Sequence, residues 1–284
     1  MRIALVAPSA RFSEEAAERV AAIAARTQPG VELYFHPQCF LTHNHFAGTD
    51  AARADALVEV ANDPGFDAIW FARGGYGACR IAEDVLARLG PAARAKSWLG
   101  YSDGGFLLAG LYRAGFERIA HGPMAQDVLR EGGEAAAERA LAWLANRAAD
   151  ALEPGLEPGR RHAAFNVTVL SMLLGTALEP DLSGHILLLE EVSEHMYATD
   201  RALFHLAASP AIQRVAGIRF GRAVDVKPND PDFGEDEEAI ALMWCERYGI
   251  AWLGRADIGH DSANKVVPFG HFDAPQASLS TEKP

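Results

Sequence analysis

Cysteine, lysine and long hydrophobic runs are all scarce in this chain of 284 residues. Cys39, Cys79 and Cys245 are too few and too widely spaced for a disulfide framework or a four-thiolate zinc site. No apolar run approaches the roughly 18 residues that a membrane-spanning helix needs. The first run, at residues 3–7, ends at a proline and is shorter than the ~7–15-residue core of a signal peptide. We therefore expect a cytoplasmic protein that does not associate with membranes.

Positive charge is also in short supply. The chain has 26 basic and 38 acidic residues, which gives a net charge of −12 at pH 7. Such a surface repels polyanions, and this argues against a nucleic-acid partner. Hydrophobic residues, by contrast, are abundant and make up 49% of the chain. That content is enough for a substantial core, and the length fits one large domain or two of ordinary size.

The first half of the chain alternates short apolar runs with amphipathic stretches. We expect strands at residues 3–7, 31–35, 66–72, 98–101 and 118–121. We expect helices at residues 14–25, 50–62, 78–89, 106–114 and 134–146, with Ser13 as the N-cap of the first. Strands and helices that alternate at this spacing predict parallel strands joined by right-handed crossovers, which is a doubly wound, Rossmann-like α/β domain.

The pattern changes after a segment rich in proline and glycine. Residues 152–159 repeat the tetrapeptide Leu-Glu-Pro-Gly and show no periodicity, as expected of a domain linker. We therefore predict an α/β domain at residues 1–150, a linker at 151–161 and a smaller, mixed α+β domain at 162–284. In the second domain we expect strands at residues 167–174, 186–189, 215–220 and 250–253, and helices at 201–208 and 235–248. The polar residues 273–284 are expected to be loose.

The strongest local signal for chemistry is Gly100-Tyr101-Ser102-Asp103-Gly104, which matches the G-x-S-x-G nucleophile elbow. A serine at a strand-to-helix turn projects its hydroxyl at the carboxyl edge of the sheet, where open α/β sheets bind ligands. The backbone N–H groups that follow are placed to stabilise an oxyanion. From these residues alone, a Ser102 that only caps the helix of a non-catalytic ligand-binding protein is an open alternative.

A second signal is the glycine-rich loop Arg73-Gly74-Gly75-Tyr76-Gly77, directly after a predicted strand. Clustered glycines let a backbone approach a ligand closely and expose its amides. The dinucleotide-binding spacing G-x-G-x-x-G fails, because Arg80 stands where the third glycine belongs. The loop is therefore either an oxyanion loop or a plain tight turn.

A serine nucleophile needs a base, and the base needs a group that orients it. Among ten histidines, His260 lies in a Gly-flanked turn after a predicted strand. Glu190 and Glu191 end the apolar run at residues 186–189, so a carboxylate there is near the interior and requires a partner. That partner is either an imidazole or one of the many arginines. The group Cys39, His43 and His45 fits no zinc template, and we expect no metal.

Taken together, motifs along nearly the whole chain resemble the serine-type L,D-carboxypeptidases, the muramoyltetrapeptide carboxypeptidase family, which also includes the microcin C immunity peptidases. The matching pieces are, in order, Val6-Ala7-Pro8-Ser9, Ala47-Gly48-Thr49-Asp50 with Arg53, Asp67-Ala68-Ile69, Arg73-Gly74-Gly75-Tyr76-Gly77, Gly100-Tyr101-Ser102-Asp103, His121-Gly122-Pro123-Met124, Leu189-Glu190 with Tyr197 and Asp200-Arg201, and Gly259-His260 with Asn264 and Pro268. Two segments depart from the family pattern. Ala164-Phe165-Asn166 stands where Gly-Gly-Asn is usual, and Gly104-Gly105 stands where an apolar residue and threonine are usual.

The resemblance implies a catalytic triad of Ser102, Glu190 and His260 that is split between the two domains. It further implies an oxyanion hole made by the backbone amides of Gly75 and Asp103. Family members use no cofactor, are cytoplasmic and often dimeric, and cleave the amide bond to a terminal D-amino acid. The expected substrate is therefore a small peptide or muropeptide, such as a murein tetrapeptide that loses D-Ala through an acyl-enzyme during peptidoglycan recycling.

A carboxypeptidase also has to bind a free carboxylate, and an acidic chain needs a local cation or exposed amides for this. Arg73 is our candidate, with Gly74 and Tyr76 as further substrate-binding residues, although a structural salt bridge explains Arg73 equally well. Three alternatives to an L,D-carboxypeptidase stay open: a peptidyl-nucleotide hydrolase of the microcin C immunity type, a generic α/β-hydrolase esterase, and a non-catalytic ligand-binding protein.

Overall fold

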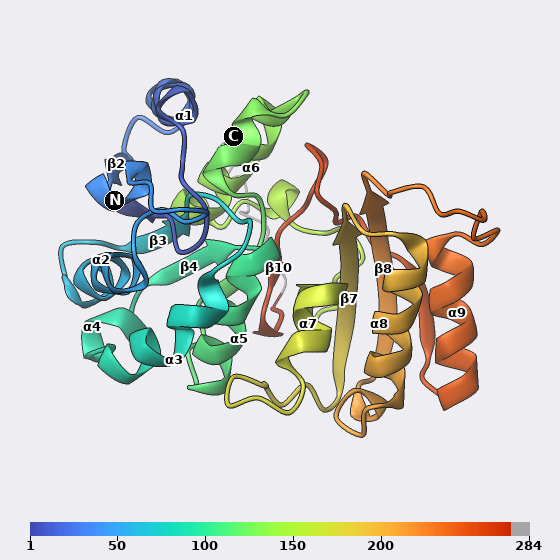
Figure 1. Cartoon of the computed structure of the whole chain (residues 1–284). Helices are drawn as coiled ribbons and strands as arrows, with labels where there is room; N and C mark the ends of the chain where they lie inside the picture. Colours follow the sequence, from blue (N-terminus) through green and yellow to red (C-terminus); the bar gives the residue numbers. More distant parts are fainter. Residues whose placement is uncertain (274–284) are drawn as a thin grey trace, which may run out of the picture.

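The computed structural model of the chain describes residues 1–273, which form two β-sheets lying side by side (Figure 1). The first sheet has the strand order β10-β5-β4-β3-β1-β2 and the second has the order β11-β6-β7-β8-β9. The strands are β1 (Arg2–Val6), β2 (Glu32–Phe35), β3 (Ala68–Phe71), β4 (Ser97–Gly100), β5 (Ile119–His121), β6 (Arg161–Asn166), β7 (His185–Val192), β8 (Gly217–Val224), β9 (Trp252–Arg255), β10 (Val267–Pro268) and β11 (Gly270–His271). The helices are α1 (Glu14–Thr27), α2 (Asp50–Asn62), α3 (Ala78–Arg88), α4 (Pro91–Arg94), α5 (Gly105–Arg113), α6 (Gly133–Asn146), α7 (Val167–Leu173), α8 (Met196–Ala208) and α9 (Glu237–Tyr248).

The first sheet is covered by helices on both faces, as predicted. Strands β1 to β5 pair in parallel, and successive side chains of a strand point to opposite faces. Ile3 and Leu5 accordingly pack in the cluster that contains α1 and α6, whereas Ala4 and Val6 pack in the cluster that contains α2, α3 and α5. Figure 1 shows the same division, with α1 and α6 above the sheet and α2, α3 and α5 below it. Ser13 caps α1 by accepting a hydrogen bond from the Ala16 N–H.

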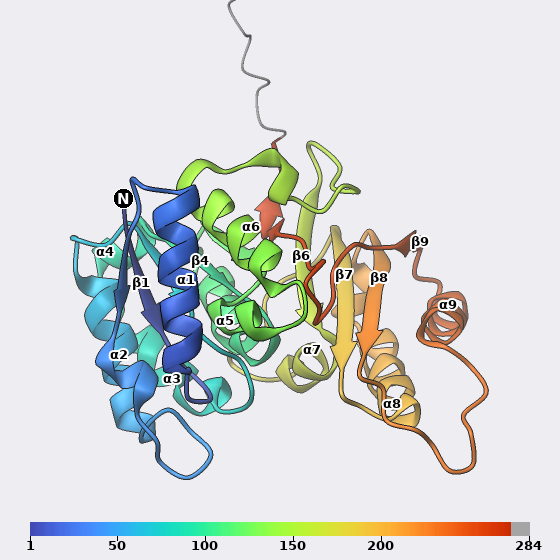
Figure 2. The ribbon, with the colours of Figure 1, turned by 90° about the horizontal axis from the view of Figure 1, so that it is seen from above.

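The second sheet is also mainly parallel, since β6, β7, β8 and β9 pair in parallel and only β11 is antiparallel. Helices α7, α8 and α9 lie along one of its faces (Figure 2). The expected fold class is confirmed: the chain has two α/β domains whose sheets contain parallel strands. No helix within residues 1–273 is long and apolar enough to cross a membrane. The predicted loose tail lies outside the described residues, apart from Asp273.

One predicted strand is wrong. Residues 167–173 form α7 and Leu174 is its C-cap, and the strand of this region is β6, immediately before the helix. The run Val-Thr-Val-Leu-Ser-Met-Leu-Leu is apolar and rich in β-branched residues, so its composition favours a strand. An N-cap favours the helix instead, because the Asn166 side chain accepts a hydrogen bond from the Val169 N–H at the first turn of α7.

The end of the described chain joins the two sheets. Val267 and Pro268 pair with β5 of the first sheet, and Gly270 and His271 pair with β6 of the second. The first sheet therefore includes a strand that follows the predicted linker by more than one hundred residues, while the linker itself stays a prediction. Between the pairs, the Phe269 ring packs edge-on against Tyr112 and Phe165, with centroid distances of 5.6 and 5.1 Å.

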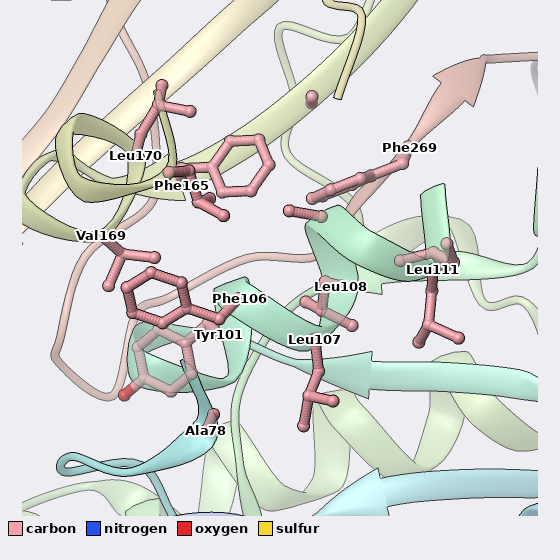
Figure 3. Packing of buried hydrophobic residues seen from close by; sticks show 14 of the residues in the cluster. Ala78, Tyr101, Phe106, Leu107, Leu108, Leu111, Phe165, Val169, Leu170 and Phe269 are labelled. Carbon is pink, nitrogen blue, oxygen red and sulfur yellow. The ribbon is translucent and has the colours of Figure 1, made fainter. Parts of the chain in front are cut away.

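The domains also meet directly where α5 packs against α7. Figure 3 shows Phe106 and Leu108 of α5 on one side of this contact, with Val169 and Leu170 of α7 and Phe165 on the other. All of these side chains are buried. The apolar core is thus continuous from one sheet to the other, and it holds the carboxyl ends of β4 and β7 in a fixed relation.

Candidate active site

Ser102 lies at the turn between β4 and α5, in a short 3-10 helix of residues Ser102–Gly104. Its φ of +54° places a non-glycine residue in the left-handed region, as in a nucleophile elbow. The approach of the glycine-rich loop is very close, because a Cβ at Gly74 would lie 3.0 Å from both Cβ and Oγ of Ser102. Any larger residue at position 74 would press on the hydroxyl.

Glu190 and His260 form the second part of the site. The Nδ1 of His260 is 2.5 Å from Oε2 of Glu190, and the exposed fractions of the two residues are 4% and 0%. Glu190 belongs to β7, in the middle of the second sheet, and is paired in register with Asn166 of β6. The carboxylate can thus fix the tautomer that leaves Nε2 free to accept a proton, and it can stabilise the imidazolium that then forms.

The neighbouring carboxylate has a different task. Successive residues of a strand face opposite sides, and Glu191 accepts hydrogen bonds from the side chain of Asn166, from the backbone and hydroxyl of Thr168, and from the Val192 N–H. Burial and the charge of Glu190 raise the pKa of Glu191, and these hydrogen bonds oppose the shift. Glu191 therefore stabilises the start of α7 and takes no part in orienting His260.

Two opposing effects set the basicity of His260. Burial favours the neutral imidazole, but the charge of Glu190 and its hydrogen bond outweigh burial and raise the pKa of His260. The ring of Tyr101 packs against His260 with a centroid distance of 4.5 Å. His121 lies on another side of Tyr101, at 5.4 Å, and burial lowers the pKa of His121 to about 4. His121 is therefore neutral near pH 7 and adds no charge beneath the site.

Ser102 and His260 line the same pocket, which has a volume of about 440 Å³. The lining consists of Arg73, Gly74, Gly75, Tyr101, Ser102, Met124, Gln126, Asp127, Leu129, Arg130, Val192, Ser193 and His260. Within residues 1–273, Nε2 of His260 has no hydrogen-bond partner, so it is not bonded to Ser102. Hydrogen bonds between a nucleophile and its base commonly tighten only when substrate binds. The pocket thus brings together the predicted nucleophile, Ser102, and the predicted base, His260.

The predicted oxyanion donors flank Ser102 on two loops. In the part of the chain that the structure describes, the N–H groups of Gly75 and Asp103 donate to no other backbone group. The Asp103 side chain links these loops, since its Oδ2 accepts hydrogen bonds from the Ser9 hydroxyl and, at 2.7 Å, from the Ala78 N–H. Burial raises the pKa of Asp103 and the hydrogen bonds oppose this shift.

The three predicted substrate-binding residues have different positions. Arg73 and Gly74 line the pocket, but Tyr76 is absent from its lining. The Tyr76 side chain is 51% exposed and packs against His45 and Phe46. Its role in binding stays a prediction, and the structure places it beside the pocket.

Sequence reasoning missed a group of polar residues that follows β5. Asp127 accepts hydrogen bonds from the Tyr101 hydroxyl at 2.9 Å and the Met124 N–H at 2.8 Å, and Nε of Arg130 is 3.1 Å from its Oδ1. The sequence did contain one indication of this group. Asp127 and Arg130 follow β5, which pairs in parallel with β4, so both strands end at the sheet edge where Ser102 lies. Residues 1–273 contain no group of three or more His, Cys, Asp or Glu side chains arranged to hold a metal ion.

Comparison with known proteins identifies the family. Residues 3–122 match the LD-carboxypeptidase N-terminal domain, and residues 162–272 match the LD-carboxypeptidase C-terminal domain. The chain belongs to the LD-carboxypeptidase family. This assignment confirms the predicted resemblance and makes the protein a hydrolase of the carboxypeptidase class.

Relatives with similar sequences span almost the whole chain. The murein tetrapeptide carboxypeptidase of Pseudomonas aeruginosa is 26% identical over 286 residues, which cover 95% of this chain and 91% of that protein. A Synechocystis sp. protein with a provisional carboxypeptidase name is 30% identical over 276 residues, covering 95% of this chain and 89% of its own.

Two solved structures with similar folds span almost the whole chain. The muramoyltetrapeptide carboxypeptidase from Oxalobacter formigenes superposes with a TM-score of 0.79 at 24% identity, over 95% of this chain and 93% of that one. MccF in complex with glutamyl sulfamoyl guanosine gives a TM-score of 0.77 at 18% identity, over 95% and 91% of the two chains. At these identities the structural likeness establishes the fold of this LD-carboxypeptidase family member.

Proposed function

We propose that this protein is a serine L,D-carboxypeptidase that removes a terminal D-amino acid, such as the D-Ala of a murein tetrapeptide, through an acyl-enzyme. One observation supports the proposal above all: His260 lines the same pocket as Ser102, and the buried Glu190 contacts Nδ1 of His260 at 2.5 Å. The name of the Pseudomonas aeruginosa relative supports the choice of substrate.

In the acylation step, His260 removes the hydroxyl proton of Ser102 while Oγ attacks the carbonyl carbon before the terminal residue. The N–H groups of Gly75 and Asp103 stabilise the tetrahedral oxyanion, and each such donor typically contributes about 3–4 kcal/mol to lowering the barrier. The C–N bond then breaks as His260 gives its proton to the departing amine. The products are the free D-amino acid and a peptide esterified to Ser102.

In the deacylation step, His260 accepts a proton from water, which attacks the ester carbonyl. The second tetrahedral intermediate collapses, Ser102 recovers its proton from His260, and the shortened peptide leaves with a new carboxylate. Glu190 holds the imidazole in the same tautomer in both steps. This cycle consumes one water and requires no cofactor, and a cytoplasmic role in peptidoglycan recycling, with a dimeric enzyme, completes the proposal.

The test is incubation of the protein with murein tetrapeptide and with the diastereomer that ends in L-Ala. We expect release of D-Ala from the first and no release of L-Ala from the second, measured by mass spectrometry of the shortened peptide. Preferential release of L-Ala would contradict the proposed stereospecificity. Turnover of p-nitrophenyl esters with no peptide turnover would instead favour a generic esterase.

A peptidyl-nucleotide hydrolase is the second candidate, because the fold also superposes on MccF bound to a sulfamoyl nucleoside. Aspartyl sulfamoyl adenosine, which is bound in another MccF structure, is the probe for this candidate. Cleavage of this compound at a higher kcat/KM than that of the tetrapeptide would establish the second function in place of the first.

A further inference from the structure

A carboxypeptidase must distinguish a free terminal carboxylate from an internal peptide bond. A chain with a net charge of −12 repels that carboxylate at long range. Its pocket therefore needs a local cation that can form charge-assisted hydrogen bonds. Arg73 and Arg130 are the arginines in the pocket lining, and the contacts of the two side chains differ.

One of the Nη groups of Arg73 already has a hydrogen-bond partner. It is an exposed residue, and its Nη1 donates to the backbone oxygen of Arg11 at 2.8 Å. Arg11 belongs to the connection between β1 and α1. This bond ties Arg73 to the β1–α1 connection, whereas Arg130 is paired with Asp127, which also contacts Tyr101 next to Ser102.

Arg130 is held inside the pocket in a definite orientation. Its side chain is 37% exposed, and Nε contacts Oδ1 of Asp127 at 3.1 Å. Within residues 1–273 its Nη1 and Nη2 have no hydrogen-bond partner. The paired Nη groups of a guanidinium match the two oxygens of a carboxylate. Arg130 thus has the free donors that a peptide terminus requires.

Asp127 fixes Arg130 relative to the catalytic groups. Its Oδ1 accepts from the Tyr101 hydroxyl as well as from Arg130, and its Oδ2 accepts from the Met124 N–H. Tyr101 precedes Ser102 in the chain, and its ring packs against His260. One buried carboxylate therefore positions both the guanidinium and the aromatic ring that supports the imidazole.

From these contacts we infer that Arg130 binds the terminal carboxylate of the substrate, with Asp127 as its positioning residue. The inference rests on the proposed function and names the group that selects a free carboxyl terminus over a blocked one. In this arrangement the D-residue lies between Arg130 and Ser102, with its amide nitrogen toward His260.

The test compares murein tetrapeptide with the same peptide carrying a C-terminal amide, in the wild type and in Arg130→Gln. We expect the wild type to prefer the free acid. In Arg130→Gln the KM for the acid should rise about 10- to 100-fold, the range of a charged hydrogen bond, and the preference over the amide should disappear. Arg130→Lys should restore part of the preference, because lysine keeps the charge but loses the paired donors.

Two further variants sharpen this comparison. Arg88→Gln is the matched control, since Arg88 is ion-paired with Asp55 and Asp84 on the surface away from the pocket, and it should behave as the wild type. Arg73→Gln should keep the preference for the acid. An equal loss on acid and amide in Arg130→Gln, or a loss of preference only in Arg73→Gln, would overturn the inference.

Binding in the Ser102→Ala background separates this inference from the proposed reaction. Calorimetry should detect binding of the tetrapeptide, and adding Arg130→Gln should weaken it about 10- to 100-fold. If the wild type has no turnover but this binding depends on Arg130, the proposed reaction fails and the inference stands. Tetrapeptide binding that is the same with and without Arg130, or absent in both, would refute the inference.

Discussion

At the residue scale, the pair of His260 and Glu190 makes a prediction about pH. A base must be neutral to accept a proton, so kcat/KM rises with pH as His260 loses its proton. Because Glu190 raises the pKa of His260 against the effect of burial, the acid limb of the wild-type profile should have its midpoint above about 6.5. Glu190→Gln removes the two largest effects that raise the pKa of His260, so the midpoint should move to lower pH while kcat falls about 10³- to 10⁴-fold.

The control for this pH profile is Glu191→Gln. Its carboxylate contacts Asn166, Thr168 and Val192 rather than His260, so the midpoint should stay near that of the wild type even if the protein becomes less stable. A Glu190→Gln profile with an unchanged acid limb would show that the carboxylate does not act on the titrating group.

Asp103 makes a second prediction at this scale. Asp103→Ala removes the acceptor of the Ser9 hydroxyl and the Ala78 N–H, and a buried donor without a partner costs about 1–3 kcal/mol. We expect the free energy of unfolding to fall by that amount and kcat to fall with it, because the two oxyanion loops lose their link. Asp103→Asn keeps an acceptor oxygen and should retain most of both, as denaturation curves and initial rates would show. Equal losses in the two variants would contradict this role.

At the element scale, local pattern predicted most of the helices and strands of the first domain, because its alternation of apolar runs and capped amphipathic stretches matches the structure. It failed at residues 167–174, where a continuous apolar run is compatible with a buried helix or a buried strand. The strand β6 has the sequence Arg-His-Ala-Ala-Phe-Asn, which contains no β-branched residue. Its pairing with β7 and β11 stabilises the strand conformation. These partners are distant in sequence, so the local residue pattern does not predict the strand.

The packing of α5 against α7 predicts that a larger residue at position 105 destabilises the protein. A Cβ at Gly105 would lie 3.1 Å from Cγ1 of Val169 and 3.6 Å from Cδ1 of Phe165. The contact with Val169 is tighter than normal packing, whereas the contact with Phe165 is an ordinary van der Waals distance, so a side chain at position 105 would press mainly on α7. Gly105→Thr should destabilise the protein by about 1–3 kcal/mol through overpacking.

A double-mutant cycle tests the contact directly. Val169→Ala removes the nearest obstructing atom, so the double variant Gly105→Thr with Val169→Ala should be more stable than the sum of the single changes predicts, by about 0.5–3 kcal/mol. Urea unfolding provides the four free energies. Strict additivity would mean that the two residues do not compete for the same space.

At the scale of the whole molecule, the segment of β10 and β11 joins the sheets that carry the two halves of the site. Phe269→Ala removes a buried ring between Tyr112 and Phe165, and we expect a loss of about 3–5 kcal/mol. Phe204→Ala is the control, because Phe204 is 45% exposed and should cost about 1 kcal/mol or less. Thermal and urea unfolding measure both, and similar small losses would show that the junction is not important for stability.

The site as a whole was predictable only in part. Motif matches led to Ser102, His260 and Glu190. In the structure Ser102 and His260 line one pocket, and Glu190 is buried against His260. Arg130 and Asp127 carry no motif, and their significance depends on the fold of the chain after β5, which places them beside Tyr101. The apolar run alone did not distinguish Glu190 from Glu191; the resemblance pointed to Glu190, and in the structure Glu190 contacts His260 while Glu191 contacts Asn166.

Substitution of the nucleophile is the most direct measurement of the central claim. Wild-type protein and Ser102→Ala are compared for D-Ala release from murein tetrapeptide, with intact-mass analysis of rapidly quenched samples and circular dichroism as the check on folding. We expect a fall in kcat of at least about 10⁴-fold and, in the wild type alone, a tripeptide ester on the proteolytic fragment that contains Ser102. D-Ala release by folded Ser102→Ala at a rate near that of the wild type would contradict this claim.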